Sequence, residues 1–228
     1  AMDCHEDTKI SLSSRNDRQS NSFLSSSGDV STYFDQIDFE KLPNSFVIKC
    51  NHGCKWHYII KNKEQYLNNG KLVEITKRNI SGWLEQDYSF WCGFELNYKG
   101  IKPKIIIEKL LREEVNIISD EIQIYCFNGK PIFFADIHHF ANKEVLTTFD
   151  ENFLQVENFY GNTDFLDNLN SDEILKKAVL LSSKLAKDFD FVRIDWMRYK
   201  DKLYFEEMTF TPYSGFINFN NSYNRKLG

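Results

Sequence analysis

The sequence FDFVRIDWMRYKDKLYFEEMTFTPYSG, residues 189–215, contains the most informative pattern in the chain. Up to Met197 its side chains alternate in character, as in a β-strand with two different faces. The apolar face consists of Val192, Ile194 and Trp196, and the other face of Phe191, Arg193 and Asp195. Charged groups on a face that otherwise reads as strand interior indicate an active site.

A second strand is predicted from Leu203 to Thr211, after the turn-prone segment 200–202. Asp195 and Glu207 are equally far from Asp201, so a hairpin that closes there puts the two carboxylates opposite each other. Because like charges in such positions repel, the pair requires a cation, and carboxylate oxygens suit Mg²⁺. The alternative is a solvated strand face with ordinary surface charges. The face that carries Glu207 is expected to consist of Phe205, Glu207 and Thr209.

The composition is that of a globular protein. Of 228 residues, 42% are hydrophobic and 15% aromatic, which suffices for one good core or two small lobes. The net charge of −5 argues against nucleic-acid binding through a broad, positively charged surface. No apolar run approaches the roughly 18 to 20 residues of a membrane span, and the N-terminus lacks the apolar segment of a signal peptide. We therefore expect a cytoplasmic protein.

The five cysteines are scattered and contain no C-x-x-C pair, which favours reduced thiols. Cys50 and Cys54 flank His52 in a spacing that could hold zinc, but no second Cys and His cluster completes a tetrahedral site. The sequence therefore does not favour a zinc centre.

Residues 42–63 contain the second informative pattern. A short strand, 46–48, ends at Lys49, and a turn at 51–53 precedes another strand, 56–60. A lysine at a strand end beside exposed backbone N–H groups can bind phosphate. Such a lysine can also simply be solvated.

The other elements follow from local patterns. Residues 1–32 are polar and cannot form a core of their own, so 1–41 is expected to be a short arm. Residues 64–90 contain short helical pieces, and 101–111 contains a buried strand. Asn128-Gly129 predicts a hairpin between 122–127 and 131–137. An amphipathic helix is expected over 172–188, with Ser171 as its N-cap.

Taken in order, these patterns resemble the TupA-like ATP-grasp proteins, a family named for teichuronopeptide synthesis and found in polysaccharide-synthesis clusters. The resemblance runs from about Ile37 to the C-terminus. Its motifs are LPNSFVIKCNHG (42–53), KPKIIIEKLL (102–111), CFNGKP (126–131), FDFVRID (189–195) and FEEMTFTPYSG (205–215).

The resemblance implies an α+β ATP-grasp fold, with two α+β lobes and ATP held between their sheets. Residues 42–111 would be the small lobe up to the adenine hinge, and 112–228 the large lobe with the metal-binding hairpin. The domain that usually precedes these lobes would be absent or much reduced, because only the arm 1–41 stands in its place.

The resemblance also assigns roles to residues. Lys49 would hold the ATP phosphates, and the loop around Gly53 would close over them. Arg193 would steady the acyl phosphate and the tetrahedral species. The rest of the nucleotide site would be Lys104 and the hinge residues Glu108, Lys109, Leu110 and Leu111. The magnesium ligands would be Asp195, Glu207 and Thr209.

The implied reaction is ATP-dependent ligation of a carboxylate to an amine through an acyl phosphate, with release of ADP and phosphate. The substrates would be a uronic acid sugar and an amino acid or other amine, joined by an amide bond in capsular or cell-wall polysaccharide synthesis. ATP and Mg²⁺ would be the cofactors, and other polysaccharide-synthesis enzymes would be partners. No nucleic acid or membrane span is expected.

The sequence departs from the family pattern at two places that face substrates. His52-Gly53-Cys54 stands where a Ser-Gly pair more often follows the first glycine, and His138 and His139 stand where an arginine tends to lie near the phosphates. Substrate contacts are expected from these three histidines. Recognition of the acceptor is expected from a partner or from an aromatic surface around Trp56, Trp91 and Phe94. Two other classes stay open: a degenerate nucleotide-binding module that regulates a partner, and a kinase or sugar transferase that uses the carboxylate pair for a metal-bound phosphate donor.

Overall fold

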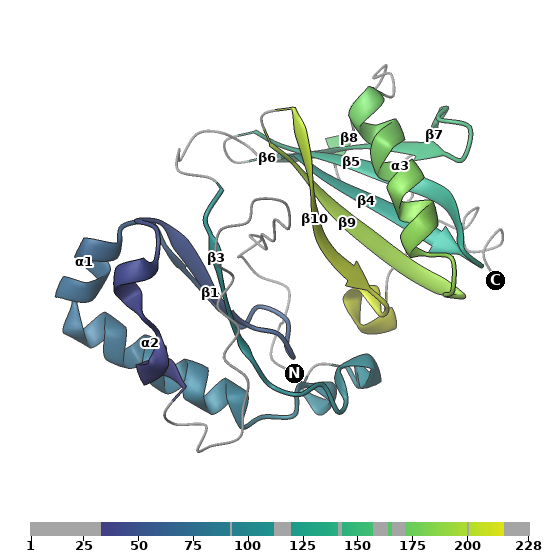
Figure 1. Cartoon of the computed structure of the whole chain (residues 1–228). Helices are drawn as coiled ribbons and strands as arrows, with labels where there is room; N and C mark the ends of the chain where they lie inside the picture. The colour runs from purple at the N-terminus through teal and green to yellow at the C-terminus, as the bar shows by residue number, and fades with distance from the viewer. Residues whose placement is uncertain are drawn as a thin grey trace. The chain divides into compact units, whose positions relative to one another are not determined.

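The structure, a computed structural model, describes residues 33–91, 93–111, 120–140, 143–156, 164–165, 172–199 and 201–216. These residues form two compact units. Residues up to Leu111 belong to the N-terminal unit, and residues from Asp120 onward belong to the C-terminal unit. Each unit combines helices with a largely antiparallel sheet (Figure 1), so the fold class is α+β, as the sequence predicts.

The N-terminal unit is built on a three-stranded antiparallel sheet with the order β2-β1-β3. Its strands are β1 (Phe46–Cys50), β2 (His57–Ile60) and β3 (Ile105–Lys109). The strands predicted in these three segments are thereby confirmed. Short 3₁₀ turns lie at Phe34–Gln36, Phe39–Lys41, Tyr88–Phe90 and Leu96–Tyr98.

Two helices, α1 (Lys63–Asn68) and α2 (Gly70–Leu84), occupy the segment in which short helical pieces are predicted. Each helix begins after an asparagine whose side chain accepts a hydrogen bond from a backbone N–H of the first turn. Asn62 accepts from Gln65 and Asn69 accepts from Leu72. These N-caps satisfy donors that a helix leaves unpaired.

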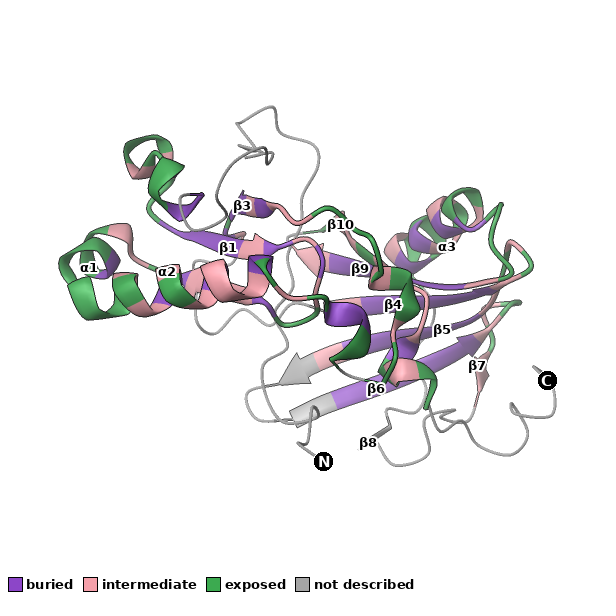
Figure 2. Ribbon diagram, turned by 90° about the horizontal axis from the view of Figure 1, so that it is seen from below, coloured by how far each residue is buried: buried purple, intermediate pink, exposed green. Residues whose placement is uncertain are grey.

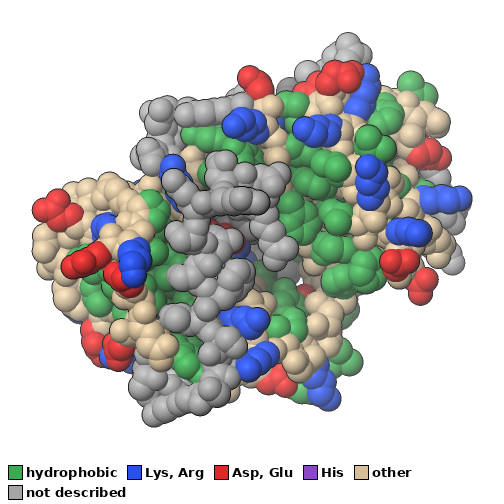
Figure 3. All heavy atoms as spheres, in the orientation of Figure 1, with side chains coloured by type: hydrophobic (Ala, Val, Ile, Leu, Met, Phe, Trp, Pro, Cys, Tyr) green, Lys and Arg blue, Asp and Glu red, His purple; other side chains and the backbone are tan. Residues whose placement is uncertain are grey.

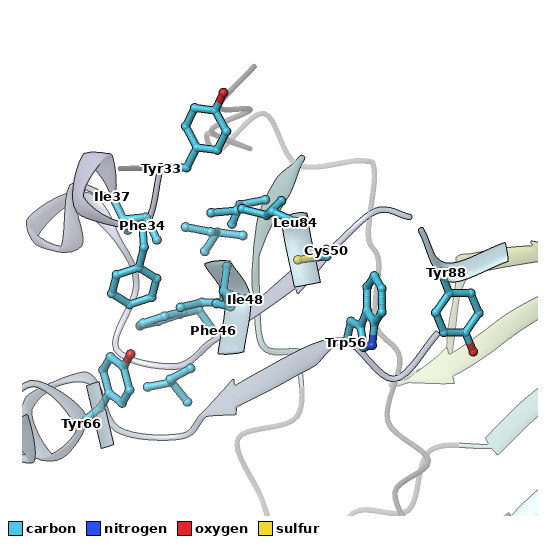
Figure 4. Close-up of a cluster of buried hydrophobic side chains, with 14 residues drawn as sticks. Tyr33, Phe34, Ile37, Phe46, Ile48, Cys50, Trp56, Tyr66, Leu84 and Tyr88 are labelled. Atoms are coloured by element: carbon cyan, nitrogen blue, oxygen red, sulfur yellow. The ribbon is translucent and has the colours of Figure 1, made fainter. Parts of the chain in front are cut away.

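One face of this sheet packs against α2 and forms the core of the unit. Figure 4 shows the side chains of this core. The core residues contributed by the sheet and by α2 are Phe46, Ile48, Cys50, Ile60, Ile105, Ile107, Ile80 and Leu84. Tyr33, Phe34 and Ile37 are buried in the same core, so the chain is already part of the N-terminal unit before residue 42. Residues 1–32 of the predicted arm lie outside the described residues.

Trp56 is buried in this core. It is 6% exposed, its ring stacks on Trp83 with centroids 6.0 Å apart, and it meets Tyr88 edge-on at 5.0 Å (Figure 4). The prediction that Trp56 belongs to an exposed aromatic surface is therefore wrong, because the ring is taken up by other aromatic rings. Trp91 and Phe94 of that predicted surface are exposed.

The Trp56 ring lies so close to the backbone of Gly53 that this position has no room for a side chain. A Cβ atom at Gly53 would lie 2.3 Å from Cε3 of Trp56. The Gly53→Ala variant should therefore lose about 1–3 kcal/mol of unfolding free energy through overpacking. Thermal unfolding followed by near-ultraviolet circular dichroism measures the loss.

Gly82→Ala is the matched control for this prediction. Nothing lies within 4 Å of a Cβ atom at Gly82, which is in α2, so alanine should stabilise the helix by about 0.5–1 kcal/mol. A Gly53→Ala midpoint equal to that of the wild type would show that the loop tolerates a side chain.

The C-terminal unit is built on a seven-stranded sheet with the order β10-β9-β4-β5-β6-β7, and β8 pairs with β6 in parallel. Its strands are β4 (Asp120–Phe127), β5 (Lys130–Phe140), β6 (Lys143–Asp150), β7 (Gln155–Val156), β8 (Asp164–Phe165), β9 (Phe191–Tyr199) and β10 (Lys202–Thr209). The turn between β4 and β5 has left-handed backbone at Asn128 (φ 48°) and Gly129 (φ 74°), as a two-residue hairpin turn requires. The hairpin predicted from Asn-Gly is confirmed.

Helix α3 (Glu173–Leu185) covers one face of this sheet. Its N-cap is Asp172, whose side chain accepts a hydrogen bond from the Leu175 N–H at 2.8 Å. The prediction of Ser171 as N-cap is therefore wrong by one residue, because the Asp172 carboxylate makes the capping hydrogen bond. Figure 2 shows the exposed side of α3 in green and the buried strands β4, β5 and β9 in purple.

The two faces of this sheet carry different kinds of side chains. The face under α3 is apolar and contains Ile122, Ile124, Phe134, Val192, Ile194 and Trp196. The opposite face has a smaller apolar cluster that includes Tyr125, Phe133 and Ile137. Arg193 and Asp195 lie on this opposite face, so the alternation predicted for this strand is confirmed.

The predicted pairing of two carboxylates is also confirmed, since Glu207 on β10 is the register partner of Asp195 on β9. Next to the turn, however, Lys202 pairs with Tyr199, and simple continuation of that register would put Glu206 opposite Asp195. A β-bulge between Phe205 and Glu207 shifts the register by one residue.

The bulge also reverses the direction of the side chains before it. Phe205 pairs with Trp196 and packs against its ring edge-on at 5.6 Å, on the face that α3 covers. The prediction that Phe205 shares a face with Glu207 and Thr209 is therefore wrong, because one inserted residue changes the parity of a strand.

None of the described residues belongs to a helix long and apolar enough to cross a membrane. On the face shown in Figure 3, Lys and Arg side chains of the described residues are interspersed with Asp and Glu side chains.

Candidate active site

The β9–β10 hairpin brings four polar side chains together on the face of the sheet that α3 does not cover. Arg193 and Asp195 lie two residues apart on β9, and β10 places Thr209 opposite Arg193 and Glu207 opposite Asp195. The Arg193 side chain is bidentate toward Asp195: Nε donates to Oδ1 at 2.8 Å and Nη2 donates to Oδ2 at 2.6 Å. All four residues singled out in this hairpin are therefore neighbours.

Thr209 joins the two carboxylates of this cluster. Its hydroxyl oxygen lies 2.8 Å from Oε1 of Glu207 and 3.4 Å from Oδ2 of Asp195. Nη2 of Arg193 is 3.8 Å from Oε1 of Glu207. The cluster thus offers several oxygen atoms around one guanidinium group.

Asp195 is the buried member of the cluster, with 2% of its surface exposed. Burial raises the pKa of the Asp195 carboxyl to about 6, although the neighbouring Arg193 guanidinium acts in the opposite direction. The charged form of this buried carboxyl group is poorly solvated, so a further cation that approaches it would stabilise the charged form. Glu207, by contrast, has a side chain that is 46% exposed.

The donor set fits Mg²⁺ that is carried by a phosphate ligand. Asp195, Glu207 and the Thr209 hydroxyl would supply oxygen ligands from one side, and Mg²⁺ is commonly held by one or two carboxylates together with waters and substrate phosphates. Within the described ranges, no group of three or more His, Cys, Asp or Glu residues could hold a metal ion by itself. The cluster therefore suits a metal shared with a ligand.

In the N-terminal unit, Lys49 lies on the face of the sheet that does not pack against α2. Its Nζ atom is 2.9 Å from Oε2 of Glu108, and both side chains are largely buried, at 21% and 10% exposure. Because a strand alternates, Glu108 shares a face with Lys49, whereas Lys109 extends from the other face of β3. The structure thus brings Glu108 to Lys49 but leaves the Lys109 side chain apart.

The predicted hinge begins inside β3 and continues past its end. The Leu110 N–H donates to the Ser45 carbonyl at 3.1 Å, and Leu110 is buried while Leu111 is half-buried. In an antiparallel ladder the neighbouring residue Lys109 then directs its backbone N–H and C=O away from β1. Within the described chain β3 pairs with β1 alone, so that backbone faces an open sheet edge.

Asn51 holds the turn after β1 against the segment that leads into β3. Its side chain accepts a hydrogen bond from the Lys104 N–H at 2.7 Å and donates to the Lys102 carbonyl at 3.1 Å. Its backbone N–H donates to the Lys104 carbonyl at 3.1 Å. Lys104 is thereby fixed next to the turn that contains Gly53. The motif around Lys49 includes Asn51, but the sequence alone did not reveal this bridging role.

His52 has a structural position in the N-terminal unit. It is 3% exposed, its Nε2 lies 2.8 Å from the Trp83 carbonyl oxygen, and its ring meets Trp56 edge-on at 5.1 Å. Burial lowers the pKa of this imidazole, which favours the neutral ring. The described contacts of His52 and Trp56 are therefore those of core residues rather than of groups open to a substrate.

His138 lies on the face of the C-terminal sheet that α3 covers, opposite to the face of Asp195. It is on the same side as Asp136, and its Nε2 is 3.7 Å from Oδ1 of that residue. Arg198 links Asp136 at 3.1 Å to the capping residue Asp172 at 3.0 Å, which ties α3 to the sheet. The structure thus does not bring His138 to the Arg193 cluster. The side chain of His139 lies outside the described residues.

Gln123 is a polar residue that the sequence analysis did not single out. It is 5% exposed and is the register partner of Asp195 on β4, so it lies on the same face as the cluster. Its Nε2 donates to Oε1 of Glu121 at 2.6 Å. In the sequence, a glutamine between Ile122 and Ile124 could have indicated a polar position on the strand face opposite to these isoleucines. Only the pairing of β4 with β9 shows that Gln123 lies beside Asp195.

The chain turns in a left-handed conformation directly after β10. Tyr213 (φ 52°), Ser214 (φ 54°) and Gly215 (φ 82°) are consecutive residues with positive φ. Each non-glycine residue in this region costs roughly 1–2 kcal/mol. The left-handed backbone of this turn was not evident from the sequence. Strain of this kind is frequent beside functional sites.

These two α+β units have the ATP-grasp fold. The chain belongs to the TupA-like ATP-grasp family, whose sequence profile, TupA-like ATPgrasp, matches residues 16–228. The predicted family is thereby confirmed. No curated protein matches the chain.

Several solved structures are similar to parts of this chain at low sequence identity. D-alanine–D-alanine ligase from Bacillus anthracis, complexed with ATP, is 20% identical, with a TM-score of 0.41 over 84% of this chain and 49% of that one. D-alanine–D-alanine ligase from Helicobacter pylori is 11% identical, with a TM-score of 0.43 over 92% and 54%. Cdc123 from Schizosaccharomyces pombe is 10% identical, with a TM-score of 0.35 over 91% and 85%. The chain spans about half the length of the two ligases.

Proposed function

We propose that the protein is an ATP-dependent carboxylate–amine ligase. The observation that carries the proposal is the cluster of Arg193, Asp195, Glu207 and Thr209 on one face of the β9–β10 hairpin. A buried carboxylate, a second and exposed carboxylate and a guanidinium group are suited to hold a phosphate-bound cation and to stabilise negative oxygens. Membership of the TupA-like ATP-grasp family supports the same reading.

In the proposed reaction, a substrate carboxylate oxygen attacks the γ-phosphorus of ATP and ADP leaves, which forms an acyl phosphate. An amine then attacks the acyl carbon, loses a proton, and displaces inorganic phosphate to form an amide. The protein contributes position and charge, and no covalent bond to a side chain is needed.

Each residue has a defined part in this proposal. Lys49, held by Glu108, binds the phosphates of ATP, and the open backbone edge at Lys109 binds the adenine base. Asp195, Glu207 and Thr209 would hold Mg²⁺, which when bound neutralises charge on the phosphate oxygens. Arg193 would stabilise the oxygens of the reacting carboxyl group. Lys104, Leu110 and Leu111 complete the nucleotide site.

The substrates are proposed from the family name alone. A uronic acid sugar would supply the carboxylate, and an amino acid or another amine the nucleophile, in capsular or cell-wall polysaccharide synthesis. A screen of amino acids against uronic acid sugars should detect ADP release only when both substrates are present. Release of AMP and pyrophosphate, or of ADP without an amide product, would contradict the ligase proposal.

A second candidate is a nucleotide-binding module that regulates a partner enzyme. The bidentate pairing of Arg193 with Asp195 favours this candidate, because an arginine so placed can serve to hold the hairpin together. A module of this kind binds MgATP but does not turn it over in the presence of any substrate pair.

The nucleotide site makes a prediction of its own. MgATP should raise the unfolding temperature, because it binds the folded state, and Lys49→Ala should remove most of this shift. Differential scanning fluorimetry with and without millimolar MgATP gives the comparison. Lys61→Ala, at an exposed position just after β2, removes the same charge and should leave the shift intact. A full shift in the Lys49→Ala variant would exclude Lys49 from the phosphate site.

A further inference from the structure

The face of the N-terminal sheet that carries Lys49 also carries a histidine. His57 on β2 is the register partner of Lys49 on β1. Register partners in an antiparallel pair lie on the same face, with Cβ atoms about 5 Å apart. The next residue, Tyr58, lies on the other face, where its ring stacks on Trp83 at 5.6 Å. His57 therefore stands beside the lysine that we place at the phosphates.

The charged groups around His57 in the described part of the unit are few. Lys49 lies on β1, and Glu108 on β3 is the ion-pair partner of Lys49. Lys55 precedes His57 in the turn, and its carbonyl accepts a hydrogen bond from the His57 N–H at 3.0 Å. Of these groups, Glu108 is already engaged with the Lys49 ammonium group, so the immediate neighbour of the imidazole is a cation.

His57 is half-buried, and burial together with the positive charge of Lys49 lowers its pKa. In the free protein the imidazole is therefore neutral near pH 7, with one nitrogen that donates and one that accepts. A polyphosphate bound at Lys49 would bring several negative charges to the same place. Those charges would reverse the effect of Lys49 and favour the protonated ring, in which both nitrogens donate.

We propose that His57 is a second phosphate-binding residue beside Lys49, and that it takes up a proton when a nucleoside triphosphate binds. This inference rests on the proposed nucleotide site but concerns a residue that lies outside the motif positions assigned above. It explains why a titratable group is placed next to the phosphate lysine: the pair has a single positive charge when the site is empty and two when the ligand is present.

The sign of the pH dependence follows from linkage. Because the bound state holds His57 at a higher pKa than the free state, binding takes up protons, and affinity for MgATP rises as the pH falls toward 6. In a His57→Gln variant this contribution is lost. We expect about tenfold weaker binding at pH 6.5, the loss of a charge-assisted hydrogen bond, and a smaller difference at pH 8.

Isothermal titration calorimetry of MgATP at pH 7, repeated in two buffers with different ionisation enthalpies, measures the proton uptake directly. The wild type should take up more protons than His57→Gln. His138→Gln should match the wild type, since His138 lies on the face of the C-terminal sheet that α3 covers, opposite to the face of Asp195. Protonation of ATP itself is common to all three proteins and cancels in the comparison. His57→Lys carries a permanent charge and should bind without the pH dependence of the wild type.

The outcomes separate this inference from the proposed function. If MgATP binds to the wild type with the same proton uptake and affinity as to His57→Gln, the role of His57 is overturned while the nucleotide site stands. If MgATP fails to bind the wild type, or binds equally well to Lys49→Ala, the proposed nucleotide site is overturned, and the role of His57 with it. Unfolding temperatures of the His57 variants show whether any loss of binding reflects a damaged fold.

Discussion

The Glu207→Gln variant is expected to lose ADP release by at least about 100-fold while it unfolds at nearly the temperature of the wild type. Glu207 is the exposed carboxylate of the cluster, with 46% of its side chain accessible, so its charge contributes little to the fold. It is nevertheless the residue opposite Asp195 and the hydrogen-bond partner of Thr209. A Gln side chain has the same shape but is a poor ligand for Mg²⁺.

Two companion variants sharpen this test. Asp195→Asn should lose activity to a similar extent but should also be less stable, because it removes the charge of the carboxylate that pairs with the buried Arg193 at 2.6 Å. Glu173→Gln removes the same charge from α3, on the other side of the sheet, and should retain activity. If Glu207→Gln turned over ATP at the wild-type rate at limiting Mg²⁺, the metal assignment would be wrong.

The Arg193→Lys variant is expected to reduce amide formation by at least about tenfold and to bind MgATP within a few-fold of the wild type. Lysine keeps the charge but cannot bond two oxygens in a plane, as a guanidinium group does. The bidentate contact with Asp195 adds a second expectation, a lower unfolding temperature, because lysine cannot reproduce that contact in a buried site. Rates must therefore be measured at a temperature at which both proteins are fully folded.

Arg198→Lys is the matched control for this experiment. Arg198 pairs with Asp136 and Asp172 on the face that α3 covers, so the lysine variant should also lose stability. It should, however, keep its turnover when folded. If Arg193→Lys behaves in the same way, with full turnover at low temperature, Arg193 holds the hairpin and takes no part in the reaction.

Several strands, helices and turns could be predicted from the sequence alone. The alternation in 189–197 and the hairpin at Asn128-Gly129 are confirmed. They were predictable because strand faces and tight turns depend on neighbouring residues in the chain. The family was recognisable for a related reason, since its motifs are short and keep their order.

Which side chains meet across strands, and which are buried, depends on the tertiary structure and could not be predicted from the sequence. The bulge between Phe205 and Glu207 reverses the direction of Phe205, and no local pattern announces an inserted residue. Trp56 is buried because Trp83 and Tyr88, far along the chain, supply rings to pack against. Gln123 beside Asp195 and His57 beside Lys49 are likewise set by register, which is fixed by the packing of whole sheet faces and not by the residues that happen to become neighbours.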